Sequence, residues 1–394
     1  MAPPALSTAR KALFSAVVFA GFALAVGAVE GWLWSTRGPP PPHDQLARLS
    51  QCWIVSDTAS AGLRCHPATE ANVDVAREPT RPRVVALGGS SVRATWRAHG
   101  PRQIGNFPVE LGRLLPGVEV VNLGVPGLGA GSVARLSSEL SALQPDLVII
   151  YSGHNDYNGD VFNGRIEGLK LWAGPWYRLM ARSWIHAALF RGKRDVPRKD
   201  PAAFVNAVPT DIALRLRPEV DARFADDLSL AISSAPAPVV VSTLLRNPAF
   251  PPSGHDVRDH PRCADALRQL RHLVSTPERA LAQLEPACGD GAVTEWLRFR
   301  IAADRGDAAQ AQVHWKRSLD LDALPMRAPA SADDLIRAVA ADQSATLVDL
   351  EARFGSEAPE RWFTDTLHLS EEGARAVARE LAPVVQAALE PGAR

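Results

Sequence analysis

The chain has 394 residues, with 43 basic and 43 acidic side chains, so its formal net charge is zero. This balance argues against a nucleic-acid-binding protein that relies on a strongly cationic surface. A content of 46% hydrophobic and 22% charged residues also excludes a mainly disordered chain. The length fits either one large domain with insertions or two separate domains.

The N-terminal segment has the pattern of a membrane-targeting element. Arg10 and Lys11 precede residues 12–29, an uninterrupted run of apolar and small side chains. The run is intermediate in length between a secretory signal and a membrane span, so a signal anchor, a cleaved signal peptide and a buried core helix remain open for residues 1–35. The basic residues before the run predict a single-pass inner-membrane protein with its body outside the cytoplasm, or otherwise a periplasmic or secreted one.

Residues 36–82 are expected to form a spacer and an N-terminal flank, and four consecutive prolines in this segment predict a stiff, extended stretch. Cysteine spacing favours two local disulfides, with free buried thiols as the alternative. The two pairs would be Cys52 with Cys65 and Cys263 with Cys288. No cysteine or histidine spacing typical of a metal site is present.

Five short runs rich in β-branched residues predict strands at residues 84–87, 118–123, 147–151, 239–243 and 346–349. Each run is continuously apolar, which is typical of parallel strands covered on both faces. Helical segments between the runs favour an α/β fold for residues 83–394. The connections at about 158–238 and 245–345 are too long for simple crossovers, so both are interpreted as insertions.

Both insertions contain tryptophans. In the first, Trp172, Trp176 and Trp184 belong to an aromatic cluster that covers a site, touches a bilayer or packs an amphipathic helix onto the body. In the second, a helix is expected to start at Thr276, and Trp296 begins a pattern that resembles one tetratricopeptide-type helical hairpin. This hairpin is either a packed appendage or a module that binds a protein partner.

The first predicted strand is followed by Gly88-Gly89-Ser90-Ser91. Glycines let the chain turn sharply at the sheet edge and place a serine beside a helix N-terminus, whose free N–H groups favour a developing oxyanion. Ser90 is the expected nucleophile and Ser91 the alternative. The same sequence also occurs in ordinary turns.

A glycine-rich segment that includes Gly127 follows the second strand, at the sheet edge where ligands of open parallel sheets bind. A dinucleotide-binding fingerprint needs a third spaced glycine or alanine where Ser132 stands, so no cofactor is expected. The third strand is followed by Ser152-Gly153-His154-Asn155-Asp156, in which the Asn155 amide can face a developing negative charge.

The last polar motif lies near the C-terminus, where Asp365 and His368 stand three residues apart before a predicted helix that Ser370 caps. Serine needs a base within hydrogen-bond reach, and that base needs a partner that fixes its tautomer. His368 and Asp365 can supply these two roles. A metal site formed by both residues with His154 and Asp156 is the alternative, and no metal is expected because the acyl-transfer interpretation accounts for more of the motifs.

These four motifs, in this order and each after a strand, resemble those of the SGNH hydrolase superfamily, also called the GDSL esterase/lipase family. The resemblance implies a flavodoxin-like three-layer α/β/α sandwich with about five parallel strands. It also implies Ser90 as nucleophile, His368 as base and Asp365 as its partner. The oxyanion hole would comprise the N–H groups of Ser90 and Gly127 and the side chain of Asn155. One position departs from the family pattern, because Gly89 stands where Gly-Asp-Ser has its acid.

The function expected from the sequence is an extracytoplasmic serine esterase that cleaves a carboxylic ester, such as an O-acetyl group, through an acyl-enzyme on Ser90. Its substrate would be a small-molecule, glycan or lipid ester. An O-acyltransferase with the same triad is one alternative. A non-catalytic assembly protein that presents the helical insertion to a partner is another.

Overall fold

The structure is a computed structural model of the whole chain, which divides into two compact units: Met1–Arg48 with Gly168–Pro197, and Leu49–Glu167 with Arg198–Arg394. The described residues are 21, 24–33, 35–36, 51–56, 59–66, 73–76, 79–93, 105–157, 210–253, 263, 276–323 and 325–390.

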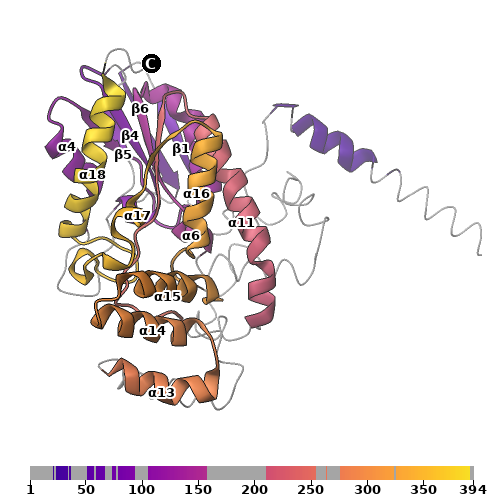
Figure 1. The fold of residues 1–394 in the computed structure, drawn as a ribbon. Coiled ribbons are helices and arrows are strands. Elements are labelled where there is room, and N and C mark those ends of the chain that lie inside the picture. The colour runs from indigo at the N-terminus through magenta and orange to yellow at the C-terminus, as the bar shows by residue number, and fades with distance from the viewer. Residues whose placement is uncertain are drawn as a thin grey trace, which may run out of the picture. The chain divides into compact units, whose positions relative to one another are not determined.

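In the first unit, the described residues 21, 24–33 and 35–36 are helical and form the indigo ribbon in Figure 1. No helix within the described ranges is both long and apolar enough to cross a membrane. Most of the apolar run at 12–29 lies outside these ranges, as do the proline spacer and the tryptophan cluster of the first insertion.

The second unit is built on a five-stranded parallel sheet with the order β5-β4-β6-β7-β8. In chain order this is 2-1-3-4-5, the order of flavodoxin-like folds, and the parallel five-stranded sheet agrees with the α/β class that the sequence predicts. The strands β4, β6 and β7 are buried along their whole length because both faces of the sheet are covered. The bounds are β4 Arg83–Gly88, β5 Glu119–Asn122, β6 Leu147–Tyr151, β7 Val239–Ser242 and β8 Thr346–Val348.

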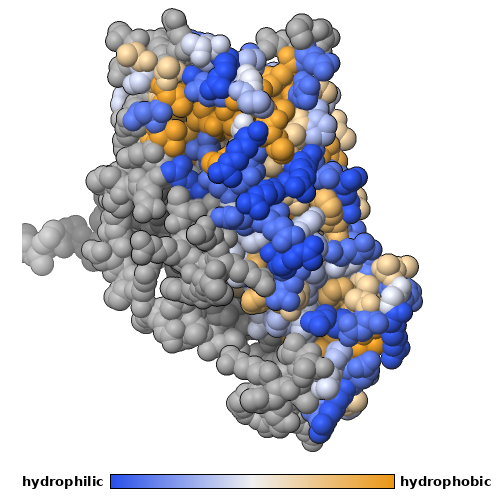
Figure 2. Space-filling view, turned by 90° about the vertical axis from the view of Figure 1, so that its left-hand side faces the viewer, coloured by the Kyte–Doolittle hydropathy of each residue, from blue (hydrophilic) through white to orange (hydrophobic). Residues whose placement is uncertain are grey.

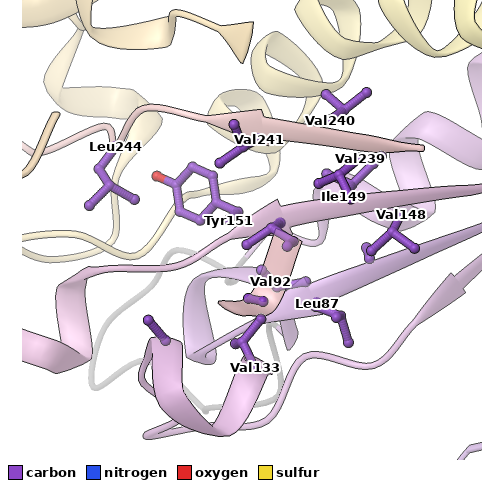
Figure 3. Packing of buried hydrophobic residues seen from close by; sticks show 14 of the residues in the cluster. Leu87, Val92, Val133, Val148, Ile149, Tyr151, Val239, Val240, Val241 and Leu244 are labelled. Carbon is purple, nitrogen blue, oxygen red and sulfur yellow. The ribbon is translucent and has the colours of Figure 1, made fainter. Parts of the chain in front are cut away.

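Helices cover both faces of this sheet (Figure 1). One layer contains α4 (Phe107–Leu114) and α18 (Glu371–Leu389), and the other contains α5 (Ala130–Glu139), α11 (Thr210–Ser233) and α16 (Ser331–Asp342). The described part of the first long connection therefore contains the crossover helix α11, and the second contains the crossover helix α16 as well as inserted structure. Figure 3 shows buried side chains such as Ile149 of β6 and Val240 of β7 packed together in the core.

The layer of α4 and α18 also forms part of the outer surface. Figure 2 views the molecule from that side and shows apolar residues gathered on the upper part of the face. Val109 and Leu114 of α4 are each 46% exposed.

An antiparallel sheet of β1 (Gln51–Ser56), β2 (Ser60–His66) and β3 (Val73–Ala76) precedes the parallel sheet, within the segment expected to be a spacer and flank. It lies against α5, where the Ile54 N–H donates a hydrogen bond to Glu139 Oε2 at 2.7 Å. The strand register places Cys52 opposite Cys65. The side chains of this cysteine pair lie outside the described residues, so their predicted disulfide stays a prediction.

The connection between β7 and β8 carries α13 (Pro277–Cys288), α14 (Ala292–Asp304) and α15 (Ala308–Leu321), which we call the helical appendage. It has its own apolar core around Trp296 and Trp315. The predicted helical pair is present as α14 and α15, and the disulfide Cys263–Cys288 forms as predicted.

The remaining short helices are α3 (Ser90–Arg93), α6 (His154–Tyr157), α17 (Leu350–Phe354), η1 (Leu140–Leu143), η3 (Gly355–Glu357) and η4 (Glu360–Trp362). Two of them, α3 and α6, begin immediately beyond the carboxyl ends of β4 and β6. They therefore place the side chains of two predicted motifs at one edge of the parallel sheet.

A buried ion pair fixes the start of α16 to the segment that follows β7. Arg246 Nη1 lies 2.6 Å from Asp333 Oδ2, and the two side chains are 2% and 1% exposed. Asp333 also accepts a hydrogen bond from the Leu244 N–H at 2.9 Å. Burial raises the pKa of the Asp333 carboxyl, and the attraction of Arg246 offsets this effect only in part.

The variant D333A should lower the free energy of unfolding by about 3–5 kcal/mol, because it leaves the Arg246 guanidinium buried without its carboxylate. The adjacent Asp334 provides a matched control, since it lies in the same helical turn and is 75% exposed in its pair with Arg337. We expect D334A to cost about 0–1 kcal/mol. Urea unfolding measures both values, and equal costs would contradict the prediction.

Candidate active site

Ser90 lies at the carboxyl end of β4, where two glycines turn the chain into α3. Gly88 has a φ of 156°, and a Cβ at this position would lie 2.1 Å from the Tyr151 carbonyl oxygen, so no other residue fits. The Gly89 carbonyl accepts hydrogen bonds from the N–H groups of Val92 and Arg93. This turn places Ser90 at the first position of a helix, where its own N–H has no partner within the helix.

His368 and Asp365 lie on a short loop between η4 and α18, which we call the triad loop (residues 363–369). Its ends are joined by the bridge between Phe363 and Leu369, and the Thr364 N–H donates to the His368 carbonyl at 2.8 Å. Ser370 then caps α18 by accepting from the Gly373 N–H at 3.3 Å, as the sequence predicts. Hydrogen bonds therefore hold the two ends of the triad loop together.

The structure brings Ser90, His368 and Asp365 into one hydrogen-bonded chain. His368 Nε2 lies 2.8 Å from Ser90 Oγ, and His368 Nδ1 lies 2.6 Å from Asp365 Oδ2. Asp365 Oδ1 accepts two more hydrogen bonds, from the N–H groups of Leu367 and His368 at 2.9 and 2.8 Å. A proton on Nδ1 facing the carboxylate leaves the Nε2 lone pair free to accept the serine proton.

Burial alone would raise the pKa of the Asp365 carboxyl. Hydrogen bonds from the His368 ring and from the backbone N–H groups of Leu367 and His368 outweigh that effect and hold the pKa below its ordinary value. Asp365 is therefore a carboxylate at neutral pH, as a partner for a protonated imidazole must be.

The Asn155 amide lies beside the turn formed by Gly88, Gly89 and Ser90. Its Nδ2 donates one hydrogen bond to the Leu128 carbonyl at 2.8 Å, which leaves its second N–H for another acceptor. A Cβ at Gly89 would lie 2.3 Å from Asn155 Nδ2 and 3.2 Å from the Leu128 oxygen. Glycine at position 89, in place of the acid of the family pattern, thus leaves room for this close approach.

Gly127 precedes Leu128 in the same turn and has a φ of 82°, a conformation that favours glycine. Asp156 fixes the other end of the turn, because its two carboxylate oxygens accept from the Ala130 N–H at 3.0 and 3.1 Å. Segments that contain the three predicted oxyanion donors therefore meet at the edge of the sheet. Their roles as oxyanion donors stay predictions.

The alternative metal ligands serve other contacts. The Nδ1 atom of His154 accepts a hydrogen bond from the Ala328 N–H at 3.2 Å, and the side chain is buried. Burial lowers the pKa of His154 well below its ordinary value, and the charges of Arg246 and His368 add to this. Within the described ranges, no three histidine, cysteine, aspartate or glutamate side chains are grouped to hold a metal ion.

One well-placed polar residue did not emerge from the sequence. Asn247 follows β7, and its Nδ2 donates to the Asp365 carbonyl at 2.9 Å. A polar residue shortly after a buried parallel strand is the signal that would have identified it.

A hollow of about 460 Å³ lies on the helical appendage. Its lining includes Leu281, Arg298 and His314. None of the predicted site residues lines it. It is therefore not the pocket of the candidate active site.

Several solved structures are similar to this chain. A lipase/acylhydrolase from Enterococcus faecalis shares 14% identity with a TM-score of 0.36, and the alignment covers 79% of this chain and 98% of that one. A GDSL-like lipase from Bacteroides thetaiotaomicron shares 13% identity with a TM-score of 0.33, over 80% and 93% of the two chains. For a catalytic mutant of an acetylxylan esterase from Geobacillus stearothermophilus, the values are 13%, 0.34, 78% and 95%.

No protein-family model and no curated protein matches the sequence. Since the structural similarity scores and identities are low, the function proposed below depends on the geometry of Ser90, His368 and Asp365.

The pKa of Asp365 predicts a pH-dependent contribution to stability. A carboxyl whose pKa is lower in the folded state stabilises the fold fully above its unfolded pKa of about 4, and this stabilisation is lost as pH falls through the folded value. The variant D365N should therefore be less stable than the wild type near pH 7, and the gap should shrink towards about pH 3. Urea unfolding at both pH values measures the gap. A gap that stays constant with pH would refute the assignment.

Proposed function

We propose that this protein is a serine-dependent esterase that cleaves carboxylic esters at the carboxyl edge of its parallel sheet. The observation that carries the proposal is the continuous hydrogen-bonded chain from Ser90 Oγ through the His368 ring to the Asp365 carboxylate. This chain supplies a nucleophile, a base at hydrogen-bond distance and a group that orients the base.

In the proposed reaction, Ser90 Oγ attacks the ester carbonyl carbon while His368 Nε2 takes the hydroxyl proton. The Asp365 carboxylate stabilises the imidazolium that forms. When the tetrahedral intermediate collapses, the imidazolium returns its proton to the departing alcohol and the acyl group stays on Ser90. Water, deprotonated by His368, then releases the acid and restores the serine.

The negative oxygen of the intermediate would be stabilised by the N–H groups of Ser90 and Gly127 and by the free N–H of Asn155. Donors of this kind typically contribute on the order of 10²–10³ in rate each. Their position beside the start of α3 supports the assignment, because the Asn155 amide is held against Gly89, the residue next to the nucleophile.

We propose O-acyl esters of a glycan, lipid or small molecule as the substrate class, with acetyl esters to be tested first. Specificity in such folds depends on the loops around the site. A panel of esters that varies the acyl length and the alcohol, assayed with and without acceptor hydroxyl compounds, separates hydrolysis from acyl transfer.

The variant S90A should lower kcat for a short-chain aryl ester by on the order of 10⁴-fold or more, because no hydroxyl remains beside His368 Nε2. It should also prevent labelling by a fluorophosphonate, detected as a mass shift on the peptide that contains residue 90. The adjacent Ser91, which is 7% exposed, provides the control, and S91A should retain labelling. Labelling that persists in S90A and disappears in S91A would transfer the nucleophile to Ser91.

We also propose that the catalytic body acts outside the cytoplasm, attached to the membrane through the N-terminal segment or released from it. Two features support this location: the basic pair followed by the apolar run at 12–29, and the disulfide Cys263–Cys288, which requires an oxidising compartment to persist.

The location can be tested by expressing the full-length chain in a bacterium, separating the membrane, periplasmic and cytoplasmic fractions, and detecting the chain in each. We expect the chain in the membrane or periplasmic fraction, with no free thiol at positions 263 and 288. Deletion of residues 1–35 should move the chain to the cytoplasm with both thiols reduced. A full-length chain that stays cytoplasmic and reduced would overturn this part of the proposal.

A further inference from the structure

The segment that follows β7 lies directly against the triad loop. We call residues 247–250 the brace. Asn247 is 1% exposed, and its N–H donates to the Thr366 carbonyl at 3.0 Å while its Nδ2 donates to the Asp365 carbonyl at 2.9 Å. The brace thus binds two consecutive carbonyls of the triad loop, at the residue that orients His368.

Side chains from farther along the same connection between β7 and β8 bind the carbonyls of the brace. Arg327 donates to the Asn247 carbonyl from Nη1 at 2.7 Å and to the Phe250 carbonyl from Nη2 at 2.8 Å. Trp296 of α14 donates from Nε1 to the Pro248 carbonyl at 3.0 Å. Three of the four brace carbonyls are therefore bound by side chains of this connection.

Arg327 is bound tightly in this position. It is 2% exposed, and its guanidinium lies 4.9 Å from the centre of the Trp315 ring in α15. Burial lowers the pKa of Arg327 to about 10, because it removes the water that favours the charged guanidinium. If the brace moved away, the buried Arg327 guanidinium would lose its carbonyl acceptors, so we expect Arg327 and the brace to move together.

The chain next to Arg327 also contacts the segment that carries Asn155. Ala328, next to Arg327, donates its N–H to His154 Nδ1 at the start of α6. Arg246 binds the stretch from the side of β7, since its Nε donates to the Ala328 carbonyl at 2.6 Å. Arg327 therefore contacts the brace, which binds the triad loop, and the adjacent Ala328 contacts His154, which precedes Asn155.

We propose that Asn247 and Arg327 are positioning residues, through which the helical appendage holds Asp365 and His368 in line with Ser90. The inference rests on the proposed acyl transfer at the same site and adds a role for the appendage. Displacement of the brace moves the Asp365 backbone, and a shift of about 1 Å at a catalytic group costs on the order of 10²-fold in rate.

Four variants of the full chain test this role. N247A removes the hydrogen bond to the Asp365 carbonyl, and R327M removes both bonds to the brace while keeping a long side chain. R298M is the matched control, because Arg298 of α14 binds Glu285, Asp290 and Glu295 within the appendage. W296F, the fourth variant, removes the Nε1 donor to Pro248 and keeps an aromatic ring in the core of the appendage, although the smaller ring leaves some space there.

The first measurement is steady-state kinetics with an aryl ester. N247A and R327M should lower kcat by about 10- to 100-fold while KM changes by less than about threefold, since the base is displaced and the substrate surface is kept. R298M should keep the wild-type kcat. An unchanged kcat in N247A, or an equal loss in R298M, overturns the proposal.

The second measurement needs no turnover. Hydrogen exchange, followed by mass spectrometry, should accelerate in the peptide covering the triad loop by about tenfold or more in N247A, R327M and W296F, because the N–H groups bound to Asp365 lose their fixed acceptor. In R298M the acceleration should be confined to the appendage. Wild-type exchange of the triad loop in N247A and W296F overturns the proposal even if R327M fails to fold.

The two measurements also separate this proposal from the function on which it rests. A wild-type chain that hydrolyses no ester and resists fluorophosphonate contradicts the esterase assignment, and the exchange of the triad loop then decides the coupling alone. An active wild type whose triad loop and kcat are unaffected in N247A leaves the esterase assignment standing and refutes the positioning role.

Discussion

The hydrogen bond between His368 Nε2 and Ser90 Oγ joins residues 278 positions apart, and most of the second unit is needed to form it. Ser90 follows β4, which is an inner strand of the sheet, whereas His368 comes after β8 at the edge farther from β4. The triad loop crosses back to the serine because it is tied on the way: Gly105 N–H donates to the Leu369 carbonyl at 2.7 Å, and Asn247 binds its other side. The sheet supplies the frame, and these contacts bring the His368 ring to the Ser90 hydroxyl.

Close backbone approaches make the rest of the site possible. Positions 88, 89 and 129 have no space for a Cβ, and the atoms that fill the space are the Tyr151 carbonyl, the Asn155 amide and the Asp156 carboxylate. Each glycine costs conformational entropy on folding, and the cost is offset by hydrogen bonds that form only at this distance. The polar groups at the sheet edge are thus fixed by backbone contacts as well as by side-chain packing.

Local sequence determines much of this architecture. The predicted strand at 147–151 coincides with β6, and the four motifs fall where their residue types predict, because buried strands and glycine turns are encoded by adjacent residues. The antiparallel sheet escaped prediction since Gly62, which weakens the strand pattern of β2, is required there by the Val73 carbonyl 1.9 Å from its Cβ position. The brace escaped because its partners are contributed by residues 80 and 118 positions away.

The separation of Ser90 from His368 also sets an order in time. A ribosome adding about 5–20 residues per second takes roughly 15–55 s to travel from one to the other. During that interval the nascent chain carries the serine without a base, and a serine hydroxyl alone is a poor nucleophile at neutral pH. Any reactivity of Ser90 that depends on His368 can therefore begin only after residue 368 has been added to the chain.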